Sequence, residues 1–381
     1  MPNINVVVDC SSIFHRIAYY LASAKGHTYD NNDECLDLVR NVHSSLESVI
    51  NQYGNSVHSV HYVFDSKPNW RTEYLRTISG NVEYKQNRKE SSFNHENFIK
   101  TISLYQHVLM NDTDLFVHKY DMLESDDIIS YLADHYFDCG ASTIIISSDS
   151  DFKQKLKCVD GKVIAMYDID SKKQTHYVKR IAQTDGAEEI LVEDFDIDSL
   201  YNADVESNLL YVHESIQSNK EEIDPHKSFF IKVLSGDKSD NVPSVYTNQS
   251  GVSFGKQRAE NLYETIKEHK TIEDLVDDDD YKIFIASEII AMCKEKNIGV
   301  LQSIVDNIYR NLLLICLNSK YQIDNLEGDI KDALVSGYFS IHKDITTNQE
   351  KHKNYINTRG YGSGSLEGTS LEYQEIKHYQ S

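Results

Sequence analysis

The sequence lacks the features that mark membrane, secreted and disulfide-rich proteins. No hydrophobic run approaches the roughly 20 apolar residues of a membrane-spanning helix, and the first residues enter a β-branched run instead of a basic region followed by an apolar one. The six cysteines are scattered without a Cys-x-x-Cys pair, which fits neither a zinc site nor a disulfide framework. We therefore expect a cytoplasmic protein with reduced thiols and no membrane contact.

Positive charge is also scarce, since 38 Lys and Arg residues face 60 Asp and Glu residues for a net charge of −22. Such a balance argues against nucleic acid, whose binding depends on Lys and Arg contacts to phosphate. The charges are unevenly distributed, however. Residues 67–89 hold six basic and two acidic residues, whereas residues 183–224 hold thirteen acidic residues and one lysine. This segregation permits a basic element that meets a polyanion and an acidic segment that faces away from it.

What the chain does contain is a set of apolar runs that end in aspartate. The run Ser142–Ile146 is followed by Asp149 and Asp151, and two similar runs end at Asp9 and Asp65. Short β-branched runs of this kind predict buried parallel strands, and open α/β sheets bind their ligands outside the carboxyl ends of such strands. We therefore expect these four aspartates to lie together.

Two further acidic clusters, Glu124–Asp127 and Gly236–Asp240, add to this set. Carboxylates a few ångströms apart repel by roughly 4 kcal/mol per pair at an effective dielectric of about 20, so a divalent cation is the natural counter-charge. Hard oxygen ligands suit Mg²⁺ or Mn²⁺. An alternative remains for the first cluster, because acidic residues in a first helical turn also stabilise the helix dipole.

Two segments have the composition of nucleic-acid contacts. Residues 67–89 interleave basic residues with Trp70, Tyr74 and Tyr84, which is typical of single-strand binding by stacking and phosphate attraction. Residues 250–262 form a glycine-marked turn that runs into a helix, where backbone amides and Lys256 or Arg258 can meet a phosphate.

The periodicity elsewhere predicts an α/β amino-terminal part and a helical carboxy-terminal part. Helices are expected over 11–24, 35–52 and around 98–108, a short strand over 115–118, and a strand pair over 162–178. The acidic segment from 183 is expected to be an inserted, mostly helical subdomain. Helical spacing resumes from 229 to about 338, and the last forty residues are expected to be a flexible tail.

Seven motifs, in this order along the chain, resemble those of the 5′-nuclease (flap endonuclease) family: VVVDCSSIF, HYVFDSK, EYKQNRKE, MLESDDIISYLADHY, IIISSDSDF, VLSGDKSDNV and GVSFGKQRAENL. The likeness is strongest to the T-even phage ribonuclease H branch of the family, and it covers most of residues 1–160 and 228–340. It implies a PIN-like α/β domain with a central, mostly parallel sheet and a helical arch. It also implies an α-helical domain with a helix-three-turn-helix element that binds duplex.

The resemblance assigns roles to residues at the matching motif positions. The metal ligands or their neighbours would be Asp9, Asp65, Glu124, Asp126, Asp127, Asp149, Asp151, Asp237 and Asp240. In the arch, Tyr84 would stack on a base, and Lys85 and Arg88 would contact the scissile phosphate. The basic run over residues 67–89 adds Arg71, Arg76 and Lys89 as expected nucleic-acid contacts, and the glycine turn adds Gly251, Gly255, Lys256 and Arg258.

The implied activity is metal-dependent 5′-to-3′ exonuclease and flap endonuclease cleavage, which removes primers and flaps during phage DNA replication in the host cytoplasm. The cofactors would be two Mg²⁺ ions, for which Mn²⁺ can substitute, and a monovalent cation such as K⁺ at the helix-three-turn-helix. The expected partners are branched or 5′-ended duplex DNA, an RNA/DNA hybrid, and a single-strand binding protein or sliding clamp. The protein itself is expected to be a monomer.

The expected division of the chain is a nuclease domain over 1–182 with its arch at about 66–97, an acidic insertion over 183–226, a helical domain over 227–340 and a tail over 341–381. The insertion and tail have no counterpart in the resemblance, and the turn Gly251–Gly255 is longer than the Gly-x-Gly of many relatives.

Two other functions compete with this interpretation. A phosphatase of the haloacid-dehalogenase type also uses a strand-ending aspartate and a late Gly-Asp-x-x-x-Asp-like motif, which Gly236–Asp240 resembles. Its chemistry requires Asp-x-Asp, however, and Ser11 stands two residues after Asp9. A non-catalytic, structure-specific nucleic-acid binding protein would tolerate loss of the acidic ligands, yet every expected position holds a carboxylate.

Overall fold

The computed structural model describes residues 4–53, 57–79, 85, 93–111, 115–159, 162–170, 173–184, 187–194, 225–266, 271–295, 297 and 299–347. Among these residues, no helix has both the length and the apolar character needed to cross a membrane.

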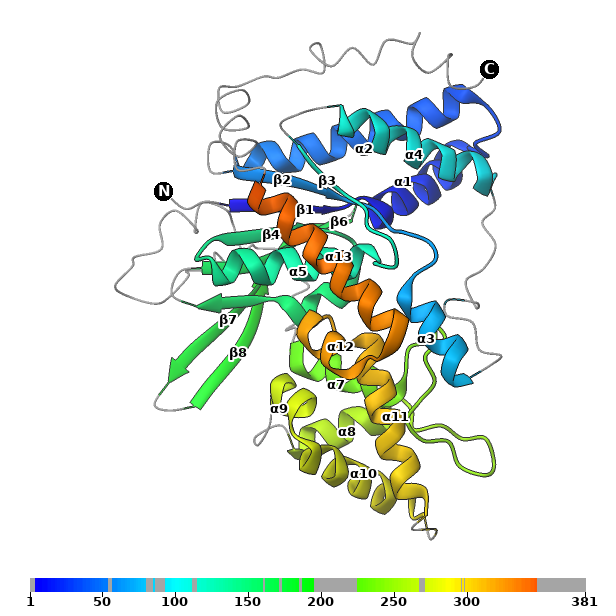
Figure 1. Ribbon diagram of the computed structural model, residues 1–381, viewed down its shortest axis with the longest axis vertical. Coiled ribbons are helices and arrows are strands. Elements are labelled where there is room, and N and C mark those ends of the chain that lie inside the picture. Colours follow the sequence, from blue (N-terminus) through cyan, green and yellow to red (C-terminus); the bar gives the residue numbers. More distant parts are fainter. Residues whose placement is uncertain are drawn as a thin grey trace.

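A central sheet organises the amino-terminal half (Figure 1). Its strands follow the order β3 (Phe116–His118), β2 (Val57–Val63), β1 (Ile4–Asp9), β4 (Ser142–Ile146), β6 (Lys162–Asp170), β7 (Lys173–Thr184) and β8 (Ala187–Asp194). The pairs from β3 to β6 are parallel. The β6–β7 and β7–β8 pairs are antiparallel, and β5 (Lys157–Val159) pairs antiparallel with β6 off this path. The mostly parallel α/β sheet predicted from the sequence is confirmed.

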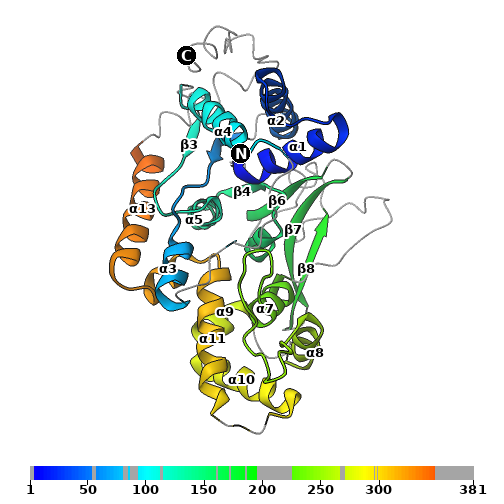
Figure 2. The same ribbon diagram turned by 90° about the vertical axis from the view of Figure 1, so that its right-hand side faces the viewer.

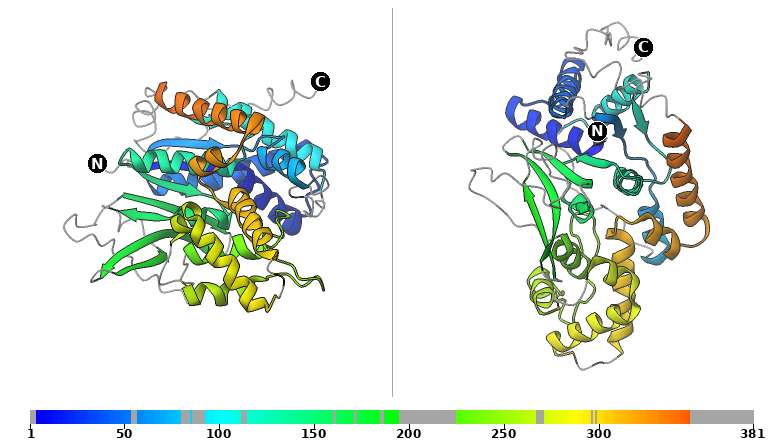
Figure 3. Two further views of the ribbon diagram at one scale, coloured as in Figure 1. Left: turned by 60° about the horizontal axis from the view of Figure 1, so that its bottom comes forward. Right: turned by 90° about the vertical axis from the view of Figure 1, so that its left-hand side faces the viewer.

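Helices cover both faces of the parallel strands. On one face lie α1 (Cys10–Lys25), α2 (Asn32–Gln52) and α4 (His95–Met110), and on the other lies α5 (Ser125–Asp138), with α13 (Gly328–Thr347) on the outer side of α5 (Figures 2 and 3). Side chains of β1 alternate between the two cores, because Val7 packs with α5 whereas Val6 and Val8 pack with α1 and α2. The continuous apolar runs therefore bury both faces of their strands.

The carboxy-terminal half is helical and comprises α7 (Pro225–Ser235), α8 (Lys256–Ile266), α9 (Ile272–Asp277), α10 (Asp279–Cys293), α11 (Val300–Ile315), α12 (Ser319–Asn325) and α13. Its buried residues belong to the same core cluster as those of α5 and the adjacent sheet face. The short helix α3 (Trp70–Ser79) lies beside this half, where it contacts α13 (Figure 1).

Local sequence signals explain where several helices begin and end. The side chain of Asp9 accepts a hydrogen bond from the Ser12 backbone amide at 3.1 Å, so the strand-ending aspartate also caps α1. Helix α1 ends at Gly26, whose φ of 72° is a left-handed conformation that glycine adopts without strain.

Two expected boundaries differ from the structure. Strand β7 continues to Thr184 and β8 follows over Ala187–Asp194, so the start of the acidic segment is an extension of the sheet and not helical. The acidic composition of residues 183–194 concealed these strands; residues 195–224 lie outside the described part. Helix α13 continues to Thr347, so the tail expected from 341 does not begin before 348. The strand pair that turns at Asp170–Lys173 is confirmed.

Candidate active site

A first carboxylate group lies at the carboxyl edge of the parallel strands. Asp9 ends β1, Asp65 follows β2, Asp149 follows β4, and Asp126 lies in the first turn of α5. All four line one cavity of about 430 Å³, together with Lys85 and several serines. The expectation that the strand-ending aspartates meet is confirmed for Asp9, Asp65 and Asp149, because neighbouring parallel strands end at the same edge of the sheet. Asp151, which was expected with them, lies in a second group instead.

Serine hydroxyls and backbone amides hold these carboxylates in place. Asp9 Oδ2 accepts a hydrogen bond from Ser147 Oγ at 2.7 Å, and Asp65 Oδ1 accepts one from the Ser125 backbone amide at 2.8 Å. Asp149 accepts from the backbone amide of Asp151 at 2.9 Å and so begins the short 3₁₀ helix η2 (Ser150–Lys155).

Proton affinities in this group are strongly perturbed. Burial, reinforced by the neighbouring Asp65, raises the pKa of Asp9 to about 7. Burial and the charge of Asp149 raise the pKa of Asp126 well above its ordinary value. Burial acts in the same direction on Asp65, but the Lys85 ammonium and hydrogen bonds from Ser125 outweigh it and lower that pKa. Acids crowded in this way are stabilised as carboxylates by a nearby cation.

A second carboxylate group consists of Asp151 from η2 and of Asp237 and Asp240 from the loop after α7. One carboxylate oxygen from each lies within 4.8 Å of the others. Lys232 of α7 enters this group, where its Nζ lies 2.6 Å from Asp151 Oδ2 and 2.6 Å from Asp237 Oδ2. Burial raises the pKa of Asp151 to about 6 in spite of Lys232, whereas Lys232 lowers the pKa of Asp237 against the effect of burial. An all-oxygen donor set of this kind fits a hard divalent cation.

Lys232 was missed by the sequence reasoning. It stands in a helix with ordinary apolar spacing, five residues before Asp237, and no pattern distinguishes it from a surface lysine. Only the packing of α7 against η2 brings it to Asp151.

Lys85 connects the two carboxylate groups. Its Nζ donates a hydrogen bond to Glu124 Oε1 at 2.6 Å, while its backbone amide donates to the carbonyl oxygen of Asp240 at 3.1 Å. Its side chain also lines the 430 Å³ cavity. The neighbouring arch residues Tyr84, Arg88 and Lys89 lie outside the described residues.

Arg71 and Asp127 do not lie where the sequence suggested. Arg71, expected to contact nucleic acid, is only 2% exposed, and its guanidinium pairs with Glu124 at 3.0 Å and with Asp127 at 2.7 Å. Asp127 is buried on this guanidinium, which leaves it in neither carboxylate group and removes it from the expected metal ligands. The charge count that placed Arg71 among the nucleic-acid contacts carries no information on burial.

The remaining expected nucleic-acid contacts lie apart from the carboxylates. Arg76 is exposed on α3 and pairs with Glu73 at 2.7 Å. Gly251 has a φ of 79° in the turn before α8, and Lys256 is exposed at the start of that helix. Gly255 is half-buried in the same turn. Arg258 is half-buried, and its guanidinium faces Cys293 of α10 at 3.8 Å.

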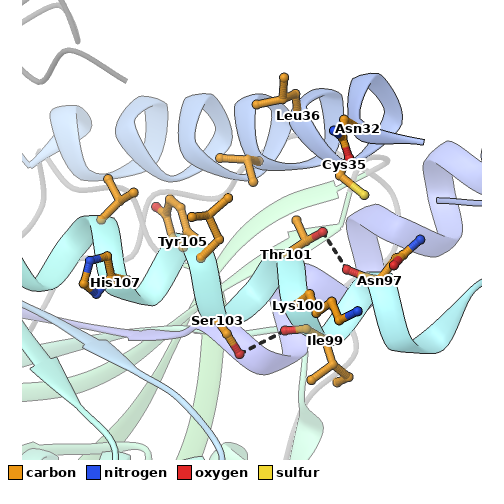
Figure 4. Close-up of a pocket in the computed structure, with 13 residues that line it drawn as sticks. Asn32, Cys35, Leu36, Asn97, Ile99, Lys100, Thr101, Ser103, Tyr105 and His107 are labelled. Carbon is orange, nitrogen blue, oxygen red and sulfur yellow. Dashed lines mark hydrogen bonds between the residues drawn. The ribbon is translucent and has the colours of Figure 1, made fainter. Parts of the chain in front are cut away.

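A larger cavity of about 490 Å³ lies between α2 and α4 (Figure 4). Cys35 and Leu36 of α2 line it together with Thr101 and Tyr105 of α4, and its lining includes no carboxylate. It shares no residue with the carboxylate cavity, so size alone does not identify the reactive site here.

Comparisons with known proteins agree with this geometry. Residues 5–189 match the model of the 5′-3′ exonuclease N-terminal resolvase-like domain. No curated protein matches the chain.

Three solved structures from bacteriophage T5 share the fold. A T5 protein co-crystallised with metal ions has a TM-score of 0.52 and 16% identity, over 91% of this chain and 100% of that one. The T5 flap endonuclease in a pseudo-enzyme–product complex with DNA and metal ions has a TM-score of 0.53 and 16% identity, with the same coverage. The T5 5′-exonuclease with bound zinc has a TM-score of 0.52 and 14% identity, over 90% of this chain and 99% of that one.

Proposed function

Because residues 5–189 match the 5′-3′ exonuclease N-terminal domain, we propose that the chain is a 5′-nuclease, with divalent-metal-dependent 5′-to-3′ exonuclease and flap endonuclease activity. It cleaves phosphodiester bonds at the 5′ ends of DNA duplexes and RNA/DNA hybrids, and it removes primers and flaps during phage DNA replication. The observation that carries the proposal is the pair of carboxylate groups at the carboxyl edge of the sheet, joined by Lys85.

The residues at this edge suit two hard cations. Asp9, Asp65, Asp126 and Asp149, with Glu124 beside them, would hold the first, and Asp151, Asp237 and Asp240 would hold the second. The raised pKa values of Asp9 and Asp151 support this assignment, because buried carboxylates need a nearby positive charge to stay ionised. When bound, such ions would activate water as a nucleophile and stabilise the attacking and leaving oxygens during an in-line displacement at phosphorus. Mg²⁺ is the proposed ion, with Mn²⁺ as a substitute.

Lys85 is the proposed contact to the scissile phosphate. Its ammonium lies on the wall of the carboxylate cavity and already pairs with Glu124, so a phosphate entering the cavity meets a positive charge held in place. A preorganised donor of this kind stabilises the charge that develops in the transition state.

Duplex contact is assigned to the exposed Arg76, Gly251 and Lys256 and to the half-buried Gly255, which lie in the helical half and on α3. The half-buried Arg258 reaches the same surface only if its contact with Cys293 is released. A monovalent cation such as K⁺ at the glycine turn, and a single-strand binding protein or sliding clamp as partner of a monomeric enzyme, complete the proposal.

The test is cleavage of end-labelled duplexes that carry a 5′ RNA primer, a 5′ flap or a nick, with and without Mg²⁺. We expect Mg²⁺-dependent release of 5′ fragments by the wild-type protein. Asp149→Asn should abolish cleavage without weakening duplex binding, because it removes a metal ligand and a negative charge near phosphate. Asp332→Asn, an exposed acid on α13, is the matched control with unchanged cleavage.

Two results would contradict the proposal. One is near-normal cleavage by Asp149→Asn, which would remove this residue from the metal site. The other is hydrolysis of a simple phosphate monoester with no cleavage of any duplex, which would favour a phosphatase.

A further inference from the structure

A chain of buried polar side chains runs from Glu124 away from the carboxylate cavity and into the helical half. Its members are Glu124, Arg71, Asp127, Gln322 and Tyr338, and none is more than 4% exposed. They come from α3, α5, α12 and α13 and from the residue that precedes α5. The proposed metal chemistry uses only Glu124 of this set, so the other four need a separate explanation.

Arg71 lies at the centre of this series of side chains, and all three of its guanidinium nitrogens donate hydrogen bonds. Nη1 donates to Glu124 Oε2 at 3.0 Å and to Asp127 Oδ2 at 2.9 Å, and Nη2 donates to Asp127 Oδ1 at 2.7 Å. Nε donates to the carbonyl oxygen of Leu314 at the end of α11 at 3.0 Å. The guanidinium also stacks on Trp70, with 4.5 Å between its carbon and the ring centroid. A planar fork held at every edge fixes the position of the carboxylates that it binds.

Glu124 is held from two sides as a result. Arg71 takes its Oε2, while Asn69 and Lys85 donate to Oε1 at 3.1 Å and 2.6 Å. Glu124 precedes α5 in an extended conformation, and its backbone amide donates to Asp127 Oδ2 at 3.1 Å. Its side chain is therefore placed by Arg71 and its backbone by Asp127.

Asp127 in turn is fixed by the helical half. Gln322 Nε2 donates to Asp127 Oδ1 at 3.3 Å and to the carbonyl oxygen of Cys316 at 2.9 Å. Tyr338 of α13 donates from its hydroxyl to Gln322 Oε1 at 2.6 Å. Gln322 thus accepts from α13 and donates to Asp127, so each step in the chain orients the next.

We propose that Arg71 is a positioning residue that holds Glu124 in its metal-binding place, and that α12 and α13 fix Arg71 through Asp127, Gln322 and Tyr338. The inference rests on the proposed function only in taking Glu124 as part of the metal site. Groups that orient metal ligands in this way change metal affinity by 10- to 100-fold in other proteins. The helical half therefore contributes to the metal site as well as to duplex binding.

The test measures Mn²⁺ binding without substrate, by electron paramagnetic resonance of free Mn²⁺, alongside the Mn²⁺ concentration that half-saturates cleavage. Arg71→Gln should weaken the tighter Mn²⁺ site by about tenfold. Arg71→Lys keeps the charge but loses the fork, and we expect it to recover only part of that loss. Duplex affinity in Ca²⁺ should stay at the wild-type value for both variants.

Tyr338→Phe is a milder variant. It removes only the hydrogen bond from Tyr338 to Gln322 and leaves the buried charges paired. We expect a two- to threefold rise in the Mn²⁺ dissociation constant measured without substrate. Tyr321→Phe is its matched control, because Tyr321, on α12, is likewise a buried tyrosine, and its hydroxyl has no hydrogen-bond partner among the described residues. Circular dichroism would verify that each variant is folded.

Three results would overturn the inference. These are unchanged Mn²⁺ affinity in folded Arg71→Gln, full recovery of affinity by Arg71→Lys, and equal behaviour of Tyr338→Phe and Tyr321→Phe. If Arg71→Gln does not fold, the comparison of the two tyrosine variants decides. Because Mn²⁺ binding is measured without substrate, an absence of nuclease activity would refute the proposed function and leave this test intact.

Discussion

Lysines occupy both carboxylate groups, and the two differ in how far the sequence reveals them. Lys85 stands in a motif whose tyrosine and arginine neighbours mark it, and the structure places its ammonium 2.6 Å from Glu124. Lys232 carries no such mark, although it contacts Asp151 and Asp237 equally closely. Sequence reasoning finds a residue when its local neighbours are distinctive, and it misses one whose role arises from helix packing alone.

Lys85→Ala should lower the cleavage rate by on the order of 10² or more, because it removes one preorganised donor to the phosphate. Affinity for plain duplex should change little. The measurement is single-turnover cleavage at saturating enzyme, with Lys100→Ala as control, since Lys100 is exposed on α4 and pairs only with Glu96 among the described residues. A variant that merely binds more weakly, with an unchanged single-turnover rate, would make Lys85 a general phosphate contact.

At the scale of elements, strand ends were the predictable feature and loop geometry was not. Asp9, Asp65 and Asp149 could be brought together from the sequence, because parallel strands deliver their carboxyl ends to one edge. Asp237 and Asp240 reach the site through the turn after α7. That turn is closed by two backbone hydrogen bonds between Asp237 and Val242, at 2.9 Å and 2.7 Å. Gly236 enters it with a φ of 75°, which no pattern in the sequence specifies.

Gly236→Ala should therefore disturb the second carboxylate group. A Cβ on Gly236 would lie 2.3 Å from the carbonyl oxygen of Val242, and the left-handed backbone adds a strain of about 1–2 kcal/mol. We expect a lower urea midpoint and loss of the weaker Mn²⁺ site. For the urea midpoint the control is Gly255→Ala, since a Cβ there meets nothing within 4 Å. Wild-type stability and Mn²⁺ stoichiometry in Gly236→Ala would show that this turn tolerates a side chain.

At the scale of the molecule, the expected α/β and helical halves are confirmed, and the two share one buried core. Residues 187–194, in which acidic pairs flank a short apolar run, form an edge strand that the acidic composition concealed. The buried Arg71 of α3 bonds to α5 and α11, whereas charge counting predicted that it lies on the surface. Long-range contacts of this kind depend on how elements pack and are not encoded in any one segment.

Removal of residues 195–224 tests how this molecule uses its acidic charge. These residues carry eight acidic residues and one lysine between the end of β8 and the start of α7. Because such a charge repels phosphate, we expect it to lie away from the substrate path, and a short linker in its place should leave flap cleavage largely intact. Cleavage at low and high salt would be compared with the full chain. A normally folded deletion variant without flap cleavage would place these residues on the substrate path.

The core that joins α5 to helices α7–α13 also sets how the chain unfolds. Leu132 and Ile145 from the sheet side belong to the same buried cluster as Leu234, Ile308 and Leu334 of the helical half. If either part unfolds, the apolar side chains of the other part become exposed to water. Amides in α5 and α11 should accordingly exchange with solvent through the same opening event, as one cooperative unit, and residues 225–347 expressed alone should not reach the native state.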